Sequence, residues 1–179
     1  MKNNLGYACI NMTLSEQPKS KRITTNRSMI KRTFKARGLP YASELALQNV
    51  LDLEKIIQWN EDNDVKFYRM SSDVFPWASE YQLEDLPDFK AIAASLQRSG
   101  DLARKYGQRI TTHPGPFNKL TSPREQVVLN TITDLENHGR LFDLMGLPRT
   151  PYAKINIHVG AHYNDKAMAI GNFCRDRRA

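Results

Sequence analysis

The stretch Arg109-Ile-Thr-Thr-His113-Pro-Gly115 decides the expected fold, because a β-branched run ends on a histidine directly before a chain-breaking Pro-Gly pair. A second stretch, Ala153-Lys-Ile-Asn-Ile-His158-Val-Gly160, repeats this arrangement. Each stretch predicts a strand that carries a histidine at its carboxyl end. Because the carboxyl ends of parallel strands meet at one edge of a sheet, we expect the two imidazoles to lie together there.

Strand-like and helical segments alternate along the rest of the chain. We predict strands at about 5–10, 65–70, 109–113 and 154–159, and helices at about 43–60, 88–107, 122–146 and 165–174. This alternation predicts an α/β fold with a parallel sheet and right-handed crossovers. A TIM barrel takes about 250 residues. The four units in residues 1–179 therefore predict a single domain of TIM-barrel type that is incomplete.

The third predicted helix has the clearest start signal in the chain. Ser122-Pro-Arg-Glu125 combines an N-cap serine, a proline at the first helical position and a glutamate at the capping-box position. His138 falls near the end of this helix, and we expect its side chain to face solvent.

Positive charge is concentrated near the start of the chain, whose formal net charge is +7. Residues 1–37 contain nine of the 26 Lys and Arg residues but one of the 19 Asp and Glu residues. We expect residues 15–40 to form a basic loop after the first strand. Lys21, Arg22 and Arg27 in this loop are candidate contacts to nucleic-acid phosphates, since clustered cations displace counterions from DNA. A solvated surface loop without such a role is the alternative.

Composition excludes several classes of protein. No apolar run approaches the roughly 20 residues of a membrane span, and the first residues lack the apolar core of a secretory signal. Two cysteines, Cys9 and Cys174, are too few for a disulfide framework. We therefore expect an intracellular protein without a membrane partner, located in the cytoplasm or nucleoid, or in the nucleus of a eukaryote.

The strand ends carry residues that suit divalent-metal chemistry. Imidazole and carboxylate groups are common ligands of such ions, so His113 and His158 are candidate metal ligands and Asp73 and His162 are candidate outer-shell partners. The alternative is that His113 begins a turn and His158 bonds a backbone carbonyl. Phe75, Trp77 and Phe117 fall on loops at the same edge, where they could stack on bases or simply anchor the loops.

Four motifs in order resemble the ultraviolet DNA damage endonucleases. They are Leu5-Gly-Tyr-Ala-Cys-Ile-Asn-Met-Thr-Leu14, Arg69-Met-Ser-Ser-Asp-Val-Phe-Pro-Trp-Ala-Ser79, Thr112-His-Pro-Gly115 and Ile157-His-Val-Gly160. The resemblance implies a TIM barrel that nicks DNA 5′ of ultraviolet photoproducts with a cluster of divalent metal ions, often manganese.

The resemblance also implies roles for individual residues. His113 and His158 would be catalytic metal ligands, and Tyr7 and Asn11 would face the lesion and its flanking backbone. The loop after the first histidine probes the duplex in this family, often with Gln followed by an aromatic residue. Here these positions are Pro116 and Phe117, which leaves only an aromatic wedge.

The family's remaining ligands fall in the second half of its barrel, and this chain stops before them, so we expect a truncated enzyme. The alternatives are a DNA-binding remnant without catalysis, or another metal-dependent TIM-barrel enzyme such as a sugar isomerase or abasic-site nuclease. Half a barrel would leave unpaired sheet edges, so we also expect self-association through those edges.

Overall fold

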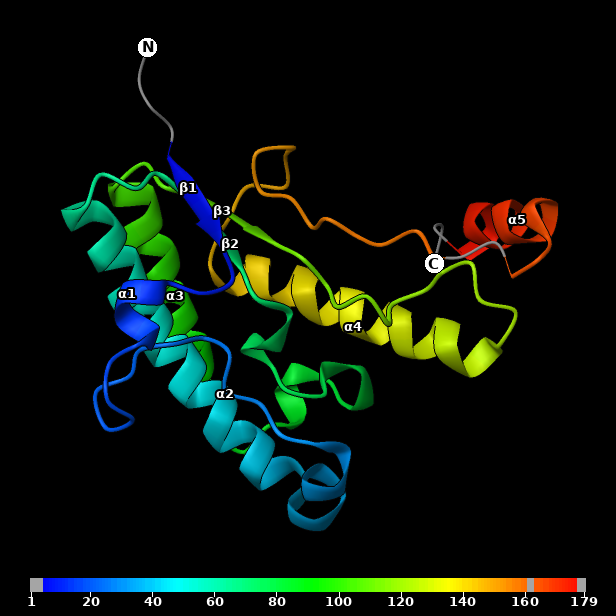
Figure 1. Cartoon of the computed structure of the whole chain (residues 1–179), viewed down its shortest axis with the longest axis horizontal. Coiled ribbons are helices and arrows are strands. Elements are labelled where there is room, and N and C mark those ends of the chain that lie inside the picture. The colour runs from blue at the N-terminus through cyan, green and yellow to red at the C-terminus, as the bar shows by residue number, and fades with distance from the viewer. Residues whose placement is uncertain (1–4, 161–162, 177–179) are drawn as a thin grey trace.

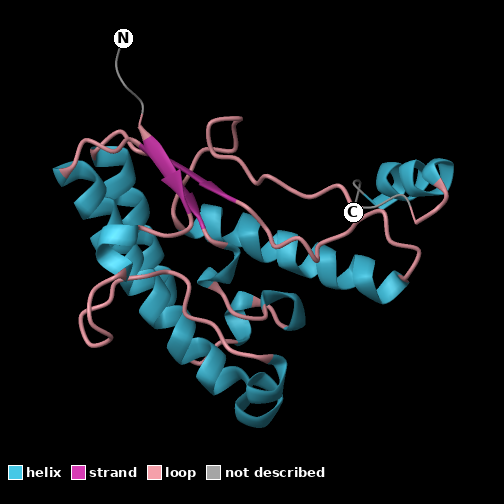
Figure 2. Cartoon of the chain, viewed as in Figure 1, coloured by secondary structure: helices cyan, strands magenta, loops and turns pink. Residues whose placement is uncertain are grey.

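A small parallel sheet forms the centre of the computed structural model, which describes residues 5–160 and 163–176 (Figures 1 and 2). Its strands are β1 (Gly6–Ala8), β2 (Phe67–Met70) and β3 (Arg109–Thr112), hydrogen-bonded in the order β1-β2-β3. Both neighbouring pairs are parallel. A helix lies in each connection between strands, which confirms the expected α/β class.

Helices cover one face of this sheet. The α-helices are α1 (Met12–Ser15), α2 (Lys31–Asp62), α3 (Phe89–Lys105), α4 (Glu125–Leu144) and α5 (Lys166–Asp176), and short 3-10 helices occupy Ser72–Val74, Ala78–Glu80 and Leu83–Asp85. Figure 1 shows α2 and α3 side by side, with α4 extending away from the sheet and α5 at its far end. No helix in the described part of the chain is long and apolar enough to cross a membrane.

Alternation along the strands sorts their side chains onto two faces. Tyr68, Met70 and Ile110 face the helices, and each is at most 1% exposed. They join one core cluster with residues of α2, α3 and α4, including Leu53, Ile57, Leu96 and Leu141. Phe67, Arg69 and Arg109 lie on the opposite face and are only half-buried, because no helix of the described residues covers it.

The fourth predicted strand is wrong as a full strand. Thr112 and Ile155 form one isolated parallel bridge, supported by hydrogen bonds between Thr112 and the backbone of Lys154 and Asn156. The segment therefore begins to pair with β3, in the predicted direction, and then leaves the sheet. Ile157 and Val159 are exposed, so burial does not stabilise an extended strand there.

The predicted boundaries of two helices also need correction. α2 begins at Lys31 rather than near residue 43, so the basic segment 15–40 is a loop only in part. The helix is kinked at Gly38, whose φ of 61° is a left-handed conformation that suits glycine. α4 begins at Glu125 with Arg124 as N-cap, and Ser122 instead accepts a hydrogen bond from the Arg124 backbone.

Candidate functional site

The residues that follow the three strands lie at one edge of the sheet, which we call the rim. Cys9 follows β1, Ser71 follows β2 and His113 follows β3. Cys9 has a φ of 63°, and its left-handed backbone turns the chain out of the strand. In parallel α/β sheets, ligands bind beyond the carboxyl ends of the strands, so the rim is the place to look for a site.

The structure brings the two predicted histidines of the rim together. The ring centroids of His113 and His158 are 4.6 Å apart, with 53° between the ring planes. His113 is half-buried and donates a hydrogen bond from Nδ1 to the Asn156 carbonyl oxygen at 2.6 Å. This bond sets the tautomer, because it leaves the lone pair on Nε2, and metal-ligating histidines commonly make such a bond. His158 is exposed.

The other predicted metal residues do not complete a ligand shell. Among residues 5–160 and 163–176, no group of three or more His, Cys, Asp or Glu side chains is placed to hold a metal ion. Asp73 lies in the first 3-10 helix, where burial and then the charge of Asp134 raise the pKa of its carboxyl group. His162 lies outside the described residues.

Tyr7 and Asn11 are engaged in the fold. The Tyr7 hydroxyl donates to Asn60 of α2 at 2.7 Å and accepts from the Asn11 side chain at 3.0 Å. Asn11 also caps α1 by accepting from the Leu14 backbone at 3.1 Å. Burial raises the pKa of Tyr7. A contact to DNA by either residue stays a prediction, and it would have to replace these bonds.

The basic loop holds one of its predicted cations in a structural role. Arg27 forms an ion pair with Asp52 of α2 at 2.6 Å and also bonds the Thr24 carbonyl oxygen at 2.6 Å. Asp52 is nearly buried, so its carboxylate offsets much of the Arg27 charge. Lys21 and Arg22 are exposed. The outward positive charge of this loop therefore comes from its exposed cations, Lys21 and Arg22 among them, rather than from Arg27.

Buried Asn49 of α2 joins the first two rim loops, and sequence reasoning did not identify it. Its amide exchanges two hydrogen bonds with the Arg27 backbone, both 3.0 Å long. It also donates to the carbonyl oxygens of Asp73 and Val74, at 3.0 and 3.2 Å. The signal in the sequence was a polar residue on the apolar stripe of a helix. A packed core tolerates such a residue only when its amide group is hydrogen-bonded.

The aromatic residues of the rim divide into two groups. Phe75 is buried, and Trp77 is half-buried, stacks on Phe34 with ring centroids 5.9 Å apart, and bonds the Met29 carbonyl. These two residues are loop anchors, the second of the two possibilities the sequence left open. Phe117 is different, because it is 87% exposed at the loop that follows His113.

The expectation for His138 is wrong. This residue is 6% exposed, and its Nδ1 atom lies 3.0 Å from the hydroxyl of Thr112 at the end of β3. Asp134, one turn earlier on α4, lies 3.8 Å from the His138 Nε2 atom. Burial lowers the pKa of His138, and the charge of Asp134 opposes that shift. The side chain of His138 was assigned to solvent because the spacing of residues near a helix end does not show which other elements cover that end.

The lowered pKa of His138 predicts that mild acid destabilises the fold. At a pH below 6.5, the ordinary pKa of histidine, His138 binds a proton in the unfolded chain more readily than in the folded chain. The free energy of unfolding should therefore fall as the pH drops. The loss can reach about 1.4 kcal/mol for each pH unit. Urea unfolding at pH 7.5 and 5.5 measures it. In His138→Gln the difference between the two pH values should shrink, and an unchanged difference would contradict the assignment.

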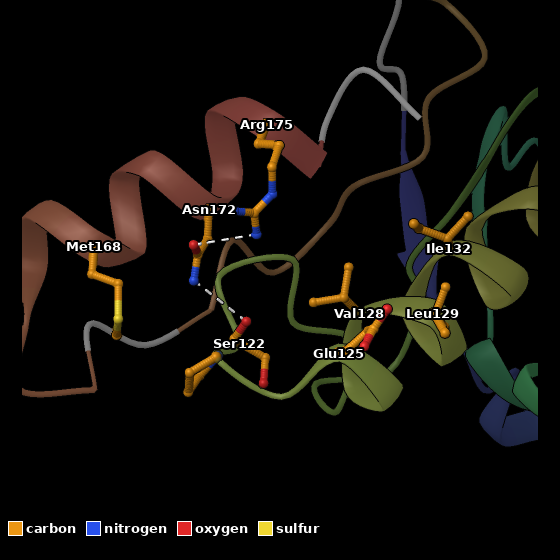
Figure 3. A pocket seen from close by; sticks show the side chains of 9 residues that line it. Ser122, Glu125, Val128, Leu129, Ile132, Met168, Asn172 and Arg175 are labelled. Carbon is orange, nitrogen blue, oxygen red and sulfur yellow. Dashed lines mark hydrogen bonds between the residues drawn. The ribbon is translucent and has the colours of Figure 1, made fainter.

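A cavity of about 520 Å³ lies between α4 and α5 (Figure 3). Ser122, Val128 and Met168 are among its lining residues, and Asn172 reaches across it to the Ser122 carbonyl oxygen at 3.4 Å. Neither His113 nor His158 lines this cavity. It therefore contributes nothing to the rim site.

Comparison with known proteins gives consistent matches along the chain. The family model described as UV-endonuclease UvdE matches residues 3–178. The UV-damage endonuclease of Schizosaccharomyces pombe is 35% identical over 174 residues, which cover 96% of this chain and 28% of that protein. The UV DNA damage endonuclease of Clostridium perfringens is 29% identical over 172 residues, which cover 96% of this chain and 38% of that protein.

A solved structure matches as well. The crystal structure of SacUVDE has a TM-score of 0.79 at 27% identity, covering 97% of this chain and 55% of that chain. This match confirms the TIM-barrel type of fold. The chain thus spans less than two fifths of the two curated relatives and about half of the solved structure.

Proposed function

Since the chain belongs to the UV-endonuclease UvdE family, we propose that it acts in DNA repair, as an endonuclease that nicks the backbone 5′ of ultraviolet photoproducts. The observation that carries the proposal is the contact of His113 and His158 at the rim, with ring centroids 4.6 Å apart. Two imidazoles on neighbouring segments at a sheet's carboxyl edge are an arrangement suited to a shared cation.

The residues at the rim fit part of a divalent-metal site. His113 and His158 would hold the ion through ring nitrogens, and Asn156 would fix the orientation of the first ring through the bond to Nδ1. Manganese is the ion we expect. A bound divalent ion supplies stabilisation of negative charge on a phosphoryl oxygen. Asp73 and His162 remain candidates for the outer shell.

The loop after β3 supports contact with the base stack. Phe117 is 87% exposed and follows Pro116, so its ring is presented to solvent on a stiff segment. An apolar side chain of this kind can enter a duplex between bases and kink it. Photoproducts weaken stacking and pairing, so damaged duplexes cost less to deform, and selection can act through deformability rather than base identity. Tyr7 and Asn11 are proposed neighbours of the lesion.

Cations on the first rim loop support contact with phosphates. Lys21 and Arg22 are exposed, whereas Arg27 would contribute a weaker field because it is paired with Asp52. The helical start of α2 continues this basic surface with Lys31 and three further cations before Gly38. Such clustered charge binds any duplex in a salt-dependent way, and sequence or lesion preference must come from elsewhere. Exposed sheet edges make self-association of two copies part of the same proposal.

A labelled duplex with one cyclobutane pyrimidine dimer tests the proposal. In the presence of Mn²⁺ we expect a single nick immediately 5′ of the dimer, none in the undamaged duplex, and none after addition of EDTA. A nick at any other position, or equal cleavage of both duplexes, would contradict the proposed reaction.

A second candidate is binding to DNA without cleavage. It is favoured by the observation that no third metal-ligating side chain joins the histidine pair among residues 5–160 and 163–176. Salt-sensitive binding to the damaged duplex, with no nick at any Mn²⁺ concentration, would support this candidate. Absence of binding to either duplex would exclude both.

A further inference from the structure

The buried side of α4 carries several polar residues where apolar residues would be expected. Thr131, Asp134 and His138 are spaced three and four residues apart, so they share one face of the helix. We call this set the α4 polar stripe. The Asp134 side chain is 13% exposed and the His138 side chain 7%. Burying a carboxylate is costly unless it is hydrogen-bonded, so the partners of this stripe need an explanation.

Two members of the α4 polar stripe bind the loop that presents Phe117. The Asn118 side chain donates to Asp134 Oδ2 at 2.5 Å, and the Lys119 backbone donates to the Thr131 hydroxyl at 2.9 Å. Asn118 is almost buried, although the residue before it is the most exposed large apolar residue among residues 5–160 and 163–176. The loop is therefore anchored directly beside its exposed ring.

The third member binds the strand that ends at the histidine site. His138 contacts the Thr112 hydroxyl at 3.0 Å, and Thr112 immediately precedes His113. One rigid helix thus contacts both the end of β3 that leads to His113 and the base of the Phe117 loop. Because these contacts are within eight residues of one helix, they fix the separation of the two functional groups.

We propose that Asp134 is a positioning residue, which orients the Phe117 ring for entry into the base stack by hydrogen-bonding Asn118. This inference rests on the proposed function, in which Phe117 contacts damaged DNA. An ordered loop has less conformational entropy to lose on binding, so the anchor favours insertion of the ring.

Exchange of the two partners tests the proposal. Asn118→Asp places two carboxylates against each other and breaks the bond, whereas the double variant Asn118→Asp with Asp134→Asn restores an amide–carboxylate pair with the roles reversed. The ratio of affinities for damaged and undamaged duplex is measured, together with the fluorescence of a 2-aminopurine placed beside the lesion, which rises when bases unstack. We expect Asn118→Asp and Phe117→Ala each to lower the ratio about 10-fold, and the double variant to recover it within about 3-fold.

Controls separate positioning from folding. Glu136→Gln changes an exposed carboxylate on the same helix and should leave ratio and fluorescence unchanged. All variants are compared well below their melting temperatures, and if Asn118→Asp does not fold, Asp134→Leu, which removes the acceptor, takes its place. Recovery of melting temperature without recovery of the ratio in the double variant would overturn the proposal. So would a wild-type ratio in Asn118→Asp.

Failure of the inference and failure of the proposed function give different results. If the wild-type chain prefers the damaged duplex and the Asn118 variants prefer it equally, only the positioning role is overturned. If the wild-type chain has no preference for the damaged duplex, the proposed function fails, and the inference fails with it.

Discussion

Replacing His113 with alanine is expected to lower the affinity of the chain for Mn²⁺ by about 100-fold or more. Loss of an outer-shell partner of a metal site commonly costs roughly 10- to 100-fold, and loss of a ligand should cost at least the upper figure. Isothermal titration calorimetry of Mn²⁺ into the folded chain measures the effect without any dependence on nicking. His158→Ala should behave in the same way, because both rings belong to one pair.

Circular dichroism must show that both variants stay folded, which we expect because His158 is exposed and His113 is only half-buried. Glu136→Gln serves as a control for weak binding at exposed carboxylates and should leave the affinity unchanged. Unaltered Mn²⁺ affinity in both histidine variants would show that the imidazole pair is a contact between rings and not a metal site. The proposed reaction would then lose its central support.

Replacing Asn49 with alanine is expected to lower the free energy of unfolding by about 3–5 kcal/mol, the largest effect on stability that we predict. The amide is 0% exposed and makes four hydrogen bonds to backbone groups of two loops. Its removal leaves buried donors and acceptors unsatisfied, and each such group costs about 1–3 kcal/mol. Urea unfolding monitored by tryptophan fluorescence measures the change.

The neighbouring Gln48 offers a matched control, because it is exposed on the same turn of α2. Gln48→Ala should change the free energy of unfolding by less than about 0.5 kcal/mol. Asn49→Ala should also weaken binding to undamaged duplex, because it detaches the loop that carries Lys21 and Arg22. If Asn49→Ala were as stable as Gln48→Ala, the two loops would be held by other contacts.

Local signals in the sequence were sufficient to predict most elements of the fold and the pairing of His113 with His158. The β-branched run before His113 and the Pro-Gly after it predicted a strand that delivers an imidazole to one edge, and the structure has that strand at Arg109–Thr112. These signals act within a few residues, through backbone sterics and the pattern of burial. Charge clustering near Lys21 was equally local.

Local signals failed where a segment depends on contacts with distant parts of the chain. The segment around Ile155 has strand composition but pairs with β3 at a single bridge, since propensity alone does not hold a strand whose following residues, Ile157 and Val159, stay exposed. The helical geometry of α2 is broken at Gly38, as this chain breaker predicts, but the short helical part before it was missed, and its Phe34 packs against Trp77 of another loop. Helix propensity predicts structure poorly where such tertiary packing competes with it.

By itself, the sequence determined the class of fold, the order of its elements and the residues that meet at the rim, because these follow from periodicity and from chain breakers. Only the tertiary structure decided which polar side chains are buried and what they bind. Asn49 reaches loops 22 to 25 residues away, and His138 reaches a strand 26 residues away. A hydrogen bond across such a separation depends on how helices dock on the sheet, and no local pattern encodes that docking.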